Sequence, residues 1–186
     1  LKIRENVENG LLREIYRGCR NRDIYGNFGM HQATLALAAV TLDSQPETNE
    51  WIDWILRAPD PNSPDRVSGG SVLPRIVESV DRDGHGLEVA PGYNNIWLTD
   101  LLNIADTLTD YHGNDMADIY NHPRIRQMLT SMMPLTINRR VTLPIGHSGR
   151  TAQKKSFATG IDTLIKGFLE TDDVRAAQFI YFLNGN

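Results

Sequence analysis

Two polar segments of the chain carry residue types that bind anions or transfer protons. The first runs from residue 25 to residue 32 and places Asn27, His31 and Gln32 at the entrance of an apolar run. If that run is a helix, its amino terminus favours a negative charge nearby. The segment therefore predicts an anion site. The alternative is that Asn27 caps the turn and His31 is a hydrogen-bonded core residue.

The second segment spans residues 83–95 and is rich in glycine, acidic groups and amides. Pro91 and Gly92 force a turn, after which Tyr93 stands at the expected entrance of a helix, with Asn94 behind it. A tyrosine in such a place can transfer protons in a reaction. The alternative is a half-buried packing residue whose hydroxyl is hydrogen-bonded.

Four stretches of the chain, taken in order, resemble the helical domain of heparinase II/III-like polysaccharide lyases. This family includes heparin, heparan sulfate and alginate lyases. The four stretches read GNFGMHQATLALAAVTLD (26–43), DGHGLEVAPGYNNIWLTDLLNIA (83–105), NHPRIRQML (121–129) and LPIGHSG (143–149). Their order and spacing carry the resemblance, which covers most of the chain. It implies cleavage of uronic-acid-containing glycans by β-elimination, without a cofactor.

The resemblance also implies roles for individual residues. Tyr93 matches the tyrosine that acts as general acid, and in some members also as base. His31 matches the position that contacts the uronate carboxylate. An amide would complete that contact, and Asn27, Gln32 and Asn94 are the candidates.

The chain departs from the family pattern at three positions. Some members have Asn directly before the histidine, where this chain has Met30, and many have His after the tyrosine, where it has Asn94. Asp is the more frequent residue where this chain has His147, which favours a structural or supporting role for His147. A further catalytic histidine of the family usually lies beyond the helical domain.

β-Elimination explains why these residue types are needed. The reaction removes the weakly acidic proton α to the carboxylate and expels the 4-linked sugar oxygen. Donors from Asn and His that neutralise the carboxylate stabilise the enolate-like intermediate, while a base and an acid transfer the protons. A tyrosine can do both in turn if nearby cations lower its pKa from about 10.

Charged side chains are candidates for holding the rest of the substrate. Arg20, Arg22, Arg139 and Arg140 could bind flanking carboxylates or sulfates, although an exposed arginine is more often only solvated. We take Arg22, together with Glu88, as predicted substrate-binding residues.

The apolar pattern predicts an all-α fold, with antiparallel helical hairpins in an incomplete (α/α) toroid. Periodicity fits a compact bundle equally well. We expect residues 71–80 to be a helix or a strand-like run. The expected helices span residues 2–19, 30–43, 49–57, 94–108, 115–133 with an interruption at Pro123, 159–169 and 172–183.

Composition limits the classes of function. The chain has 186 residues, 40% of them hydrophobic, and a formal net charge of -4. This net negative charge argues against a nucleic-acid partner. A local group of arginines can still bind an anionic polysaccharide. No apolar run reaches the roughly 20 residues of a membrane helix. Cys19, the single cysteine, is expected to be a buried thiol.

We expect residues 1–186 to form a single helical catalytic domain from a longer chain. The sequence begins at Leu1 inside an expected helix, and no signal peptide is visible. The resemblance implies that a β-sandwich domain follows the helical domain. It also implies a periplasmic or secreted bacterial protein.

Two other functions stay open. A glycoside hydrolase would need two carboxylates across a cleft, for which the candidates are Asp81, Asp83, Glu88, and either Asp53 or Asp100. A non-catalytic glycan-binding protein would tolerate the departures from the family pattern. No metal site is predicted, because the five histidines lack paired zinc spacing and the acidic residues near 81–88 lack a full calcium loop.

Overall fold

A computed structural model describes residues 2–57, 69–88, 90–109, 111, 118–147 and 160–185. These residues are mostly helical, which confirms the predicted all-α class. The residues form two compact units. Unit 1 comprises residues 1–75 and 100–116, unit 2 comprises residues 76–99 and 117–186, and each is described by itself. The predicted helix starts at 115 and 159 lie outside the described residues.

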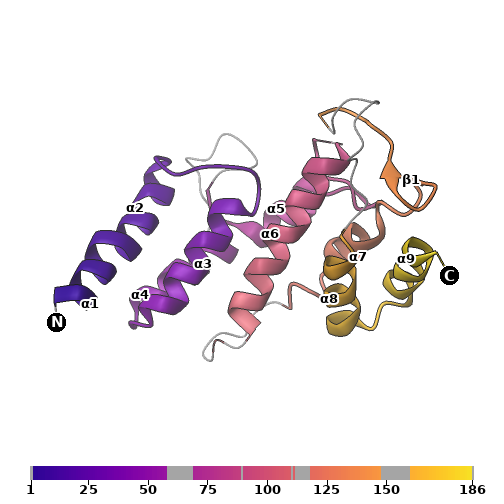
Figure 1. Ribbon diagram of the computed structural model, residues 1–186. Coiled ribbons are helices and arrows are strands. Elements are labelled where there is room, and N and C mark those ends of the chain that lie inside the picture. Colours follow the sequence, from indigo (N-terminus) through magenta and orange to yellow (C-terminus); the bar gives the residue numbers. More distant parts are fainter. Residues whose placement is uncertain are drawn as a thin grey trace. The chain divides into compact units, whose positions relative to one another are not determined.

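Unit 1 begins with a continuous helical stretch made of α1 (Lys2–Val7), the π-helical η1 (Glu8–Leu12) and α2 (Arg13–Asn21) (Figure 1). The apolar residues of the expected helix 2–19 are only partly buried. Leu12 is buried, but Ile3 is 82% exposed and Leu11 is 52% exposed. The first turns therefore have an apolar face that the described residues do not cover. Cys19 is buried, as predicted.

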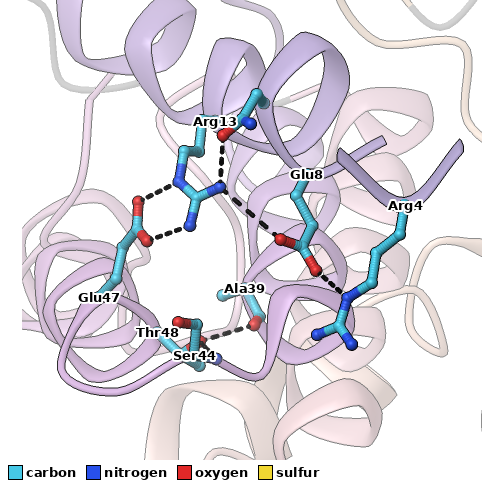
Figure 2. Close-up of polar contacts among 8 residues, drawn as sticks. Arg4, Glu8, Arg13, Ala39, Ser44, Glu47 and Thr48 are labelled. Carbon is cyan, nitrogen blue, oxygen red and sulfur yellow. Dashed lines mark hydrogen bonds and ion pairs between the residues drawn. The ribbon is translucent and has the colours of Figure 1, made fainter. Parts of the chain in front are cut away.

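Helices α3 (Met30–Leu42) and α4 (Glu47–Leu56) pack against each other. A bidentate ion pair joins Arg13 of α2 to Glu47 at the start of α4, with distances of 2.8 and 2.7 Å (Figure 2). The buried Thr48 hydroxyl accepts from Ser44 N–H and donates to the carbonyl of Ala39. Polar contacts thus fix the connection between the two helices.

An aromatic cluster fills the space between α2 and α4. The ring of Tyr16 stacks on Trp51 at a centroid distance of 4.7 Å and meets Trp54 edge-on at 6.2 Å. The guanidinium of Arg20 lies over the rings of Tyr16 and Trp54. Both tryptophans are buried, so this cluster is part of the core of unit 1.

Helices α5 (Val72–Ser79) and α6 (Pro91–Thr109) each contribute residues to both units. Helix α6 begins three residues before the predicted start at Asn94. Proline at a first helical position explains the earlier start, since its missing N–H needs no partner there. Within the described ranges, no helix combines the length and the apolar character that a membrane crossing requires.

Unit 2 also contains α7 (Pro123–Thr130), the two-residue strands β1 (Thr136–Ile137) and β2 (Val141–Thr142), α8 (Ile161–Thr171) and α9 (Val174–Asn184). The strands form an antiparallel pair. Helices α7, α8 and α9 pack together, around a core that includes Met132, Leu164 and Phe179. The last helix was expected from residue 172, but Asp172 ends α8 in a left-handed conformation and Asp173 caps α9.

Candidate functional site

The loop that precedes Tyr93 is a closed turn in unit 2. Asp81 N–H donates to the carbonyl of His85 at 2.8 Å, and Val80 forms an isolated β-bridge with Gly86. Gly84 has a positive φ of 85°, and a side chain there would collide with the backbone of Gln127. The glycines of this segment are therefore needed to place the turn against its neighbours.

Asn94 holds this loop from inside the protein. Its Oδ1 accepts from Gly86 N–H at 2.8 Å, and its Nδ2 donates to the carbonyl of Gly84 at 3.1 Å and to Ser131 Oγ at 3.0 Å. The residue is only 4% exposed. Both amide protons are thus used within unit 2. The geometry supports an anchoring role for Asn94, and its predicted substrate contact stays a prediction.

Tyr93 lies in the first turn of α6, directly before this anchor. Its side chain is half-buried, and its hydroxyl makes no hydrogen bond to another residue that the structure describes. Its ring lies 6.1 Å from the ring of His147, centroid to centroid, with the planes tilted by 60°. His147 itself is exposed. The structure thus pairs the predicted acid/base tyrosine with a histidine to which the sequence assigned only a supporting role.

Glu88 is exposed on the loop between the turn and α6. No hydrogen bond or ion pair joins its carboxylate to another described residue. Its predicted role in substrate binding stays a prediction.

The anion site predicted in unit 1 falls at the start of α3. Gly29 precedes α3 with a positive φ of 96°, and its N–H donates to Gln32 Oε1 at 3.0 Å. Gln32 Nε2 donates to the carbonyl of Gly69 at 2.8 Å, and the side chain is fully buried. The amide of Gln32 therefore caps the start of α3 and joins the segment at Gly69 to it, which is a structural role. Its predicted substrate contact stays a prediction.

The other predicted residues of unit 1 occupy distinct places. His31 is only 3% exposed, as expected for a core histidine. Asn27 is half-buried, and its carbonyl accepts from Met30 N–H at 3.0 Å. Arg22 ends α2 in a left-handed conformation and is half-buried. The roles predicted for His31, Asn27 and Arg22 stay predictions.

Asp100 is a carboxyl with an unusual environment in unit 1. Its Cβ lies against Gly29, where a side chain would come within 2.7 Å of it. One carboxyl oxygen, Oδ2, is buried and has no hydrogen-bond partner among the described residues. Burial raises the pKa of Asp100, because desolvation disfavours the charged form.

The predicted residues thus form two groups, one in each unit. His31, Gln32, Asn27 and Arg22 belong to unit 1, whereas Tyr93, Asn94 and Glu88 belong to unit 2. Within unit 2, the structure adds His147 beside Tyr93 and Ser131 behind Asn94. Across the described ranges, no three His, Cys, Asp or Glu side chains gather as they would to hold a metal ion.

The fold and this site define a mostly helical protein that carries a half-exposed tyrosine beside an exposed histidine. No protein-family model, curated protein or solved structure matches the chain.

Proposed function

We propose that the chain is a polysaccharide lyase that cleaves uronic-acid-containing glycans by β-elimination, with Tyr93 as the proton-transferring group. The observation that carries the proposal is the setting of Tyr93. The residue lies in the first turn of α6, where the buried Asn94 fixes the backbone, and its hydroxyl is not bonded to another described residue. A fixed phenol with an available hydroxyl can approach a substrate in a defined geometry.

β-Elimination from a uronate requires a proton donor of this kind. Once the α-proton has left, the electrons shift to form a carbon–carbon double bond and the 4-linked oxygen departs. That oxygen is a poor leaving group as an alkoxide, so a donor within hydrogen-bond reach accelerates its departure. The Tyr93 hydroxyl can supply this proton.

Neutralisation of the uronate carboxylate is the other requirement of the reaction. The sequence resemblance assigns it to His31 with Asn27, both of unit 1. The buried position of His31 suits a rigid hydrogen-bond donor or a core residue equally. Asn27 is the better residue to substitute, because its side chain is only half-buried and its loss should disturb the fold less than the loss of His31. If Asn27→Ala weakens turnover while the fold is retained, the carboxylate contact is supported.

A glycoside hydrolase is the second candidate, and Asp100 is the observation that favours it. A general acid in such an enzyme needs a raised pKa, which is the direction that burial gives Asp100. The sequence analysis names Asp81, Asp83 and Glu88 as candidates for the other carboxylate, and all three are exposed. Hydrolysis produces new reducing ends without a double bond, so the products distinguish it from a lyase.

The test is an ultraviolet assay on a panel of uronate glycans, in which absorbance reports the conjugated double bond made by elimination. With one glycan class, absorbance should grow, and Tyr93→Phe should reduce the rate by roughly 10²–10⁴-fold. Tyr181→Phe is the matched control, because Tyr181 is an exposed tyrosine on α9. New reducing ends without absorbance would replace the lyase by the hydrolase, and neither product would favour a glycan-binding protein.

A further inference from the structure

A hollow of about 380 Å³ lies in unit 2, where the amino-terminal ends of α7 and α9 meet. These two helices pack against each other (Figure 1). The residues that line the hollow are Asn121, Pro123, Arg126, Gln127, Asp173 and Arg175. Neither Tyr93 nor His147 is among them, and neither is any residue of the turn at 81–86. The hollow is therefore a different place from the candidate site around Tyr93.

The charged groups of this hollow leave a positive surface. Two of the lining residues, Arg126 and Arg175, carry guanidinium groups, and Asp173 contributes a carboxylate. The Asp173 side chain is only 5% exposed, whereas the side chains of Arg126 and Arg175 are 36% and 45% exposed. The single negative charge is thus buried, while both positive charges reach solvent. An anion that enters the hollow meets a net charge of about +1.

Asp173 and Gln127 fix the orientation of the Arg175 guanidinium. The carboxylate oxygens of Asp173 accept from Arg175 Nε at 3.1 Å and from Nη2 at 2.7 Å. Gln127 Oε1 accepts from Arg175 Nη1 at 3.0 Å. The Nε of Arg126 forms an ion pair with the same carboxylate at 3.5 Å. Because both guanidiniums are already held, less conformational freedom is lost when an anion binds.

Both arginines keep donors for a ligand. A guanidinium has five N–H groups, two of them on each terminal nitrogen. In the part of the chain that the structure describes, no residue accepts a hydrogen bond from the terminal nitrogens of Arg126. The helix end itself is less available, because Asp173 caps α9 and accepts from the N–H of Arg175 at 3.0 Å. The donors of this site are therefore side chains.

From this geometry we infer that Arg126 and Arg175 bind an oxyanion group of the polysaccharide, either a uronate carboxylate or a sulfate ester, away from the bond that is cleaved. Guanidinium groups bind both kinds of oxyanion through paired N–H···O hydrogen bonds. The volume lies near the lower end of the range for ligand pockets, roughly 300–1,000 Å³, which suits one charged sugar. The choice of a sugar as the carrier of the anion rests on the proposed lyase function, whereas the site itself rests on the pocket.

The first experiment uses small anions that a lyase cannot cleave. Methyl glucuronide carries a carboxylate but no 4-linked sugar, and inorganic sulfate represents the sulfate ester. Each is titrated into the wild-type protein while the arginine Nε–H resonances are followed by NMR. The resonances of Arg126 and Arg175 should shift. A response to the glucuronide alone assigns the site to uronates, a response to sulfate alone assigns it to sulfated glycans, and a response to both assigns it to either group.

Three variants test the donors. Arg126→Gln should weaken binding roughly 10-fold, as expected for loss of hydrogen bonds to a charged group. Arg126→Lys keeps the charge but loses the paired donors, so its affinity should lie between the other two. Arg17→Gln is the matched control, because it removes an exposed positive charge from α2 and should bind as wild type does. Circular dichroism of Arg126→Gln should match wild type, since Asp173 keeps its hydrogen bonds to Arg175.

The ultraviolet assay then distinguishes this site from the site of cleavage. With the polysaccharide, Arg126→Gln should raise KM severalfold and leave kcat unchanged, as for a contact equally strong in substrate and transition state. A loss of kcat at unchanged KM would overturn the inference, because it would place Arg126 at the reacting bond. Titrations in which neither anion shifts the two arginines, or in which Arg126→Gln binds as tightly as wild type, would also overturn it. A wild-type chain without absorbance would refute the lyase, while the titrations would still decide whether the anion site exists.

Discussion

Asn94 donates its side-chain amide to the hydroxyl of Ser131 at 3.0 Å and thereby joins the first turn of α6 to the end of α7. The Ser131 hydroxyl in turn donates a hydrogen bond to the carbonyl of Met128 at 2.9 Å. The same amide bonds the backbone of Gly84 and Gly86. A single buried side chain therefore fixes the loop, the helix start and the neighbouring helix within unit 2.

Replacement of Asn94 by alanine should leave buried backbone groups of Gly84 and Gly86 without partners. We expect the free energy of unfolding to fall by about 2–3 kcal/mol, since each buried unsatisfied group costs about 1–3 kcal/mol. Urea unfolding measures this change. Asn103→Ala, an exposed position on the same helix, should stay within about 0.5 kcal/mol of wild type. Equal effects at both positions would contradict the anchoring role.

Gly167 of α8 and Leu129 of α7 show how closely two helices of unit 2 approach each other. A Cβ at Gly167 would collide with the side chain of Leu129. Gly167→Ala should therefore destabilise the protein by about 1–3 kcal/mol through overpacking. Gly10 is the matched control, because a Cβ there meets nothing within 4 Å. Gly10→Ala should raise the free energy of unfolding by up to about 1 kcal/mol, because alanine favours helix more than glycine does.

Thermal melting of the two glycine variants should therefore give shifts of opposite sign. If Gly167→Ala melted at or above the wild-type temperature, Leu129 would have to move away without cost, and the close packing of α7 and α8 would not constrain unit 2.

Local sequence patterns predicted which segments are helical better than they predicted where each helix begins or which of its residues are buried. The all-α fold class was predictable because the periodicity of apolar residues reflects their burial on one face of a helix. The start of α6 at Pro91 was missed by three residues, although proline at a first helical position is a known signal. The last helix was expected from residue 172, whereas Asp173 caps α9, since both neighbours are aspartates and only the backbone conformation distinguishes them. Ile3 and Leu11 are exposed despite their spacing, because periodicity does not reveal which partner covers a face.

The candidate site depends on contacts between residues that are distant in the sequence, and these could not be predicted. Tyr93 was singled out by its turn and its neighbours, which are local features. Its proximity to His147 depends on the approach of Gly146 to Ala90. The internal hydrogen bonds of Asn94 and Gln32 could not be predicted for the same reason, because amide side chains look alike in sequence whether they face a ligand or the backbone.

Gln32 provides a test of the start of α3. Gln32→Ala removes the acceptor for Gly29 N–H and the donor to the carbonyl of Gly69, and we expect a loss of about 2–4 kcal/mol of unfolding free energy from these groups and the lost packing. Thr34→Ala, at an exposed position of the same helix, should be neutral or slightly stabilising. Chemical denaturation measures both. A Gln32→Ala protein of unchanged stability that has lost glycan binding would instead restore the predicted substrate contact.

Asp173 should make stability depend on pH in the acid range. Its side chain is 5% exposed, accepts from the backbone and guanidinium of Arg175 and pairs with Arg126 at 3.5 Å. Hydrogen bonds from the Arg175 side chain are the main cause that lowers the pKa of Asp173 from 3.8 to about 2. A carboxyl whose pKa is lower in the folded state stabilises the fold above its unfolded pKa, and this contribution disappears as the pH falls through the folded value.

We therefore expect stability to fall by on the order of 2 kcal/mol between about pH 4 and pH 2 from this group alone. Asp173→Asn retains a capping side chain but cannot titrate, so its unfolding free energy should be lower at neutral pH and should vary less over that acid range. Asp172→Asn is the control, because Asp172 is exposed and asparagine tolerates its left-handed conformation. Urea unfolding at a series of pH values gives the comparison. Parallel pH profiles for wild type and Asp173→Asn would show that the two arginines do not stabilise the Asp173 carboxylate in the folded state.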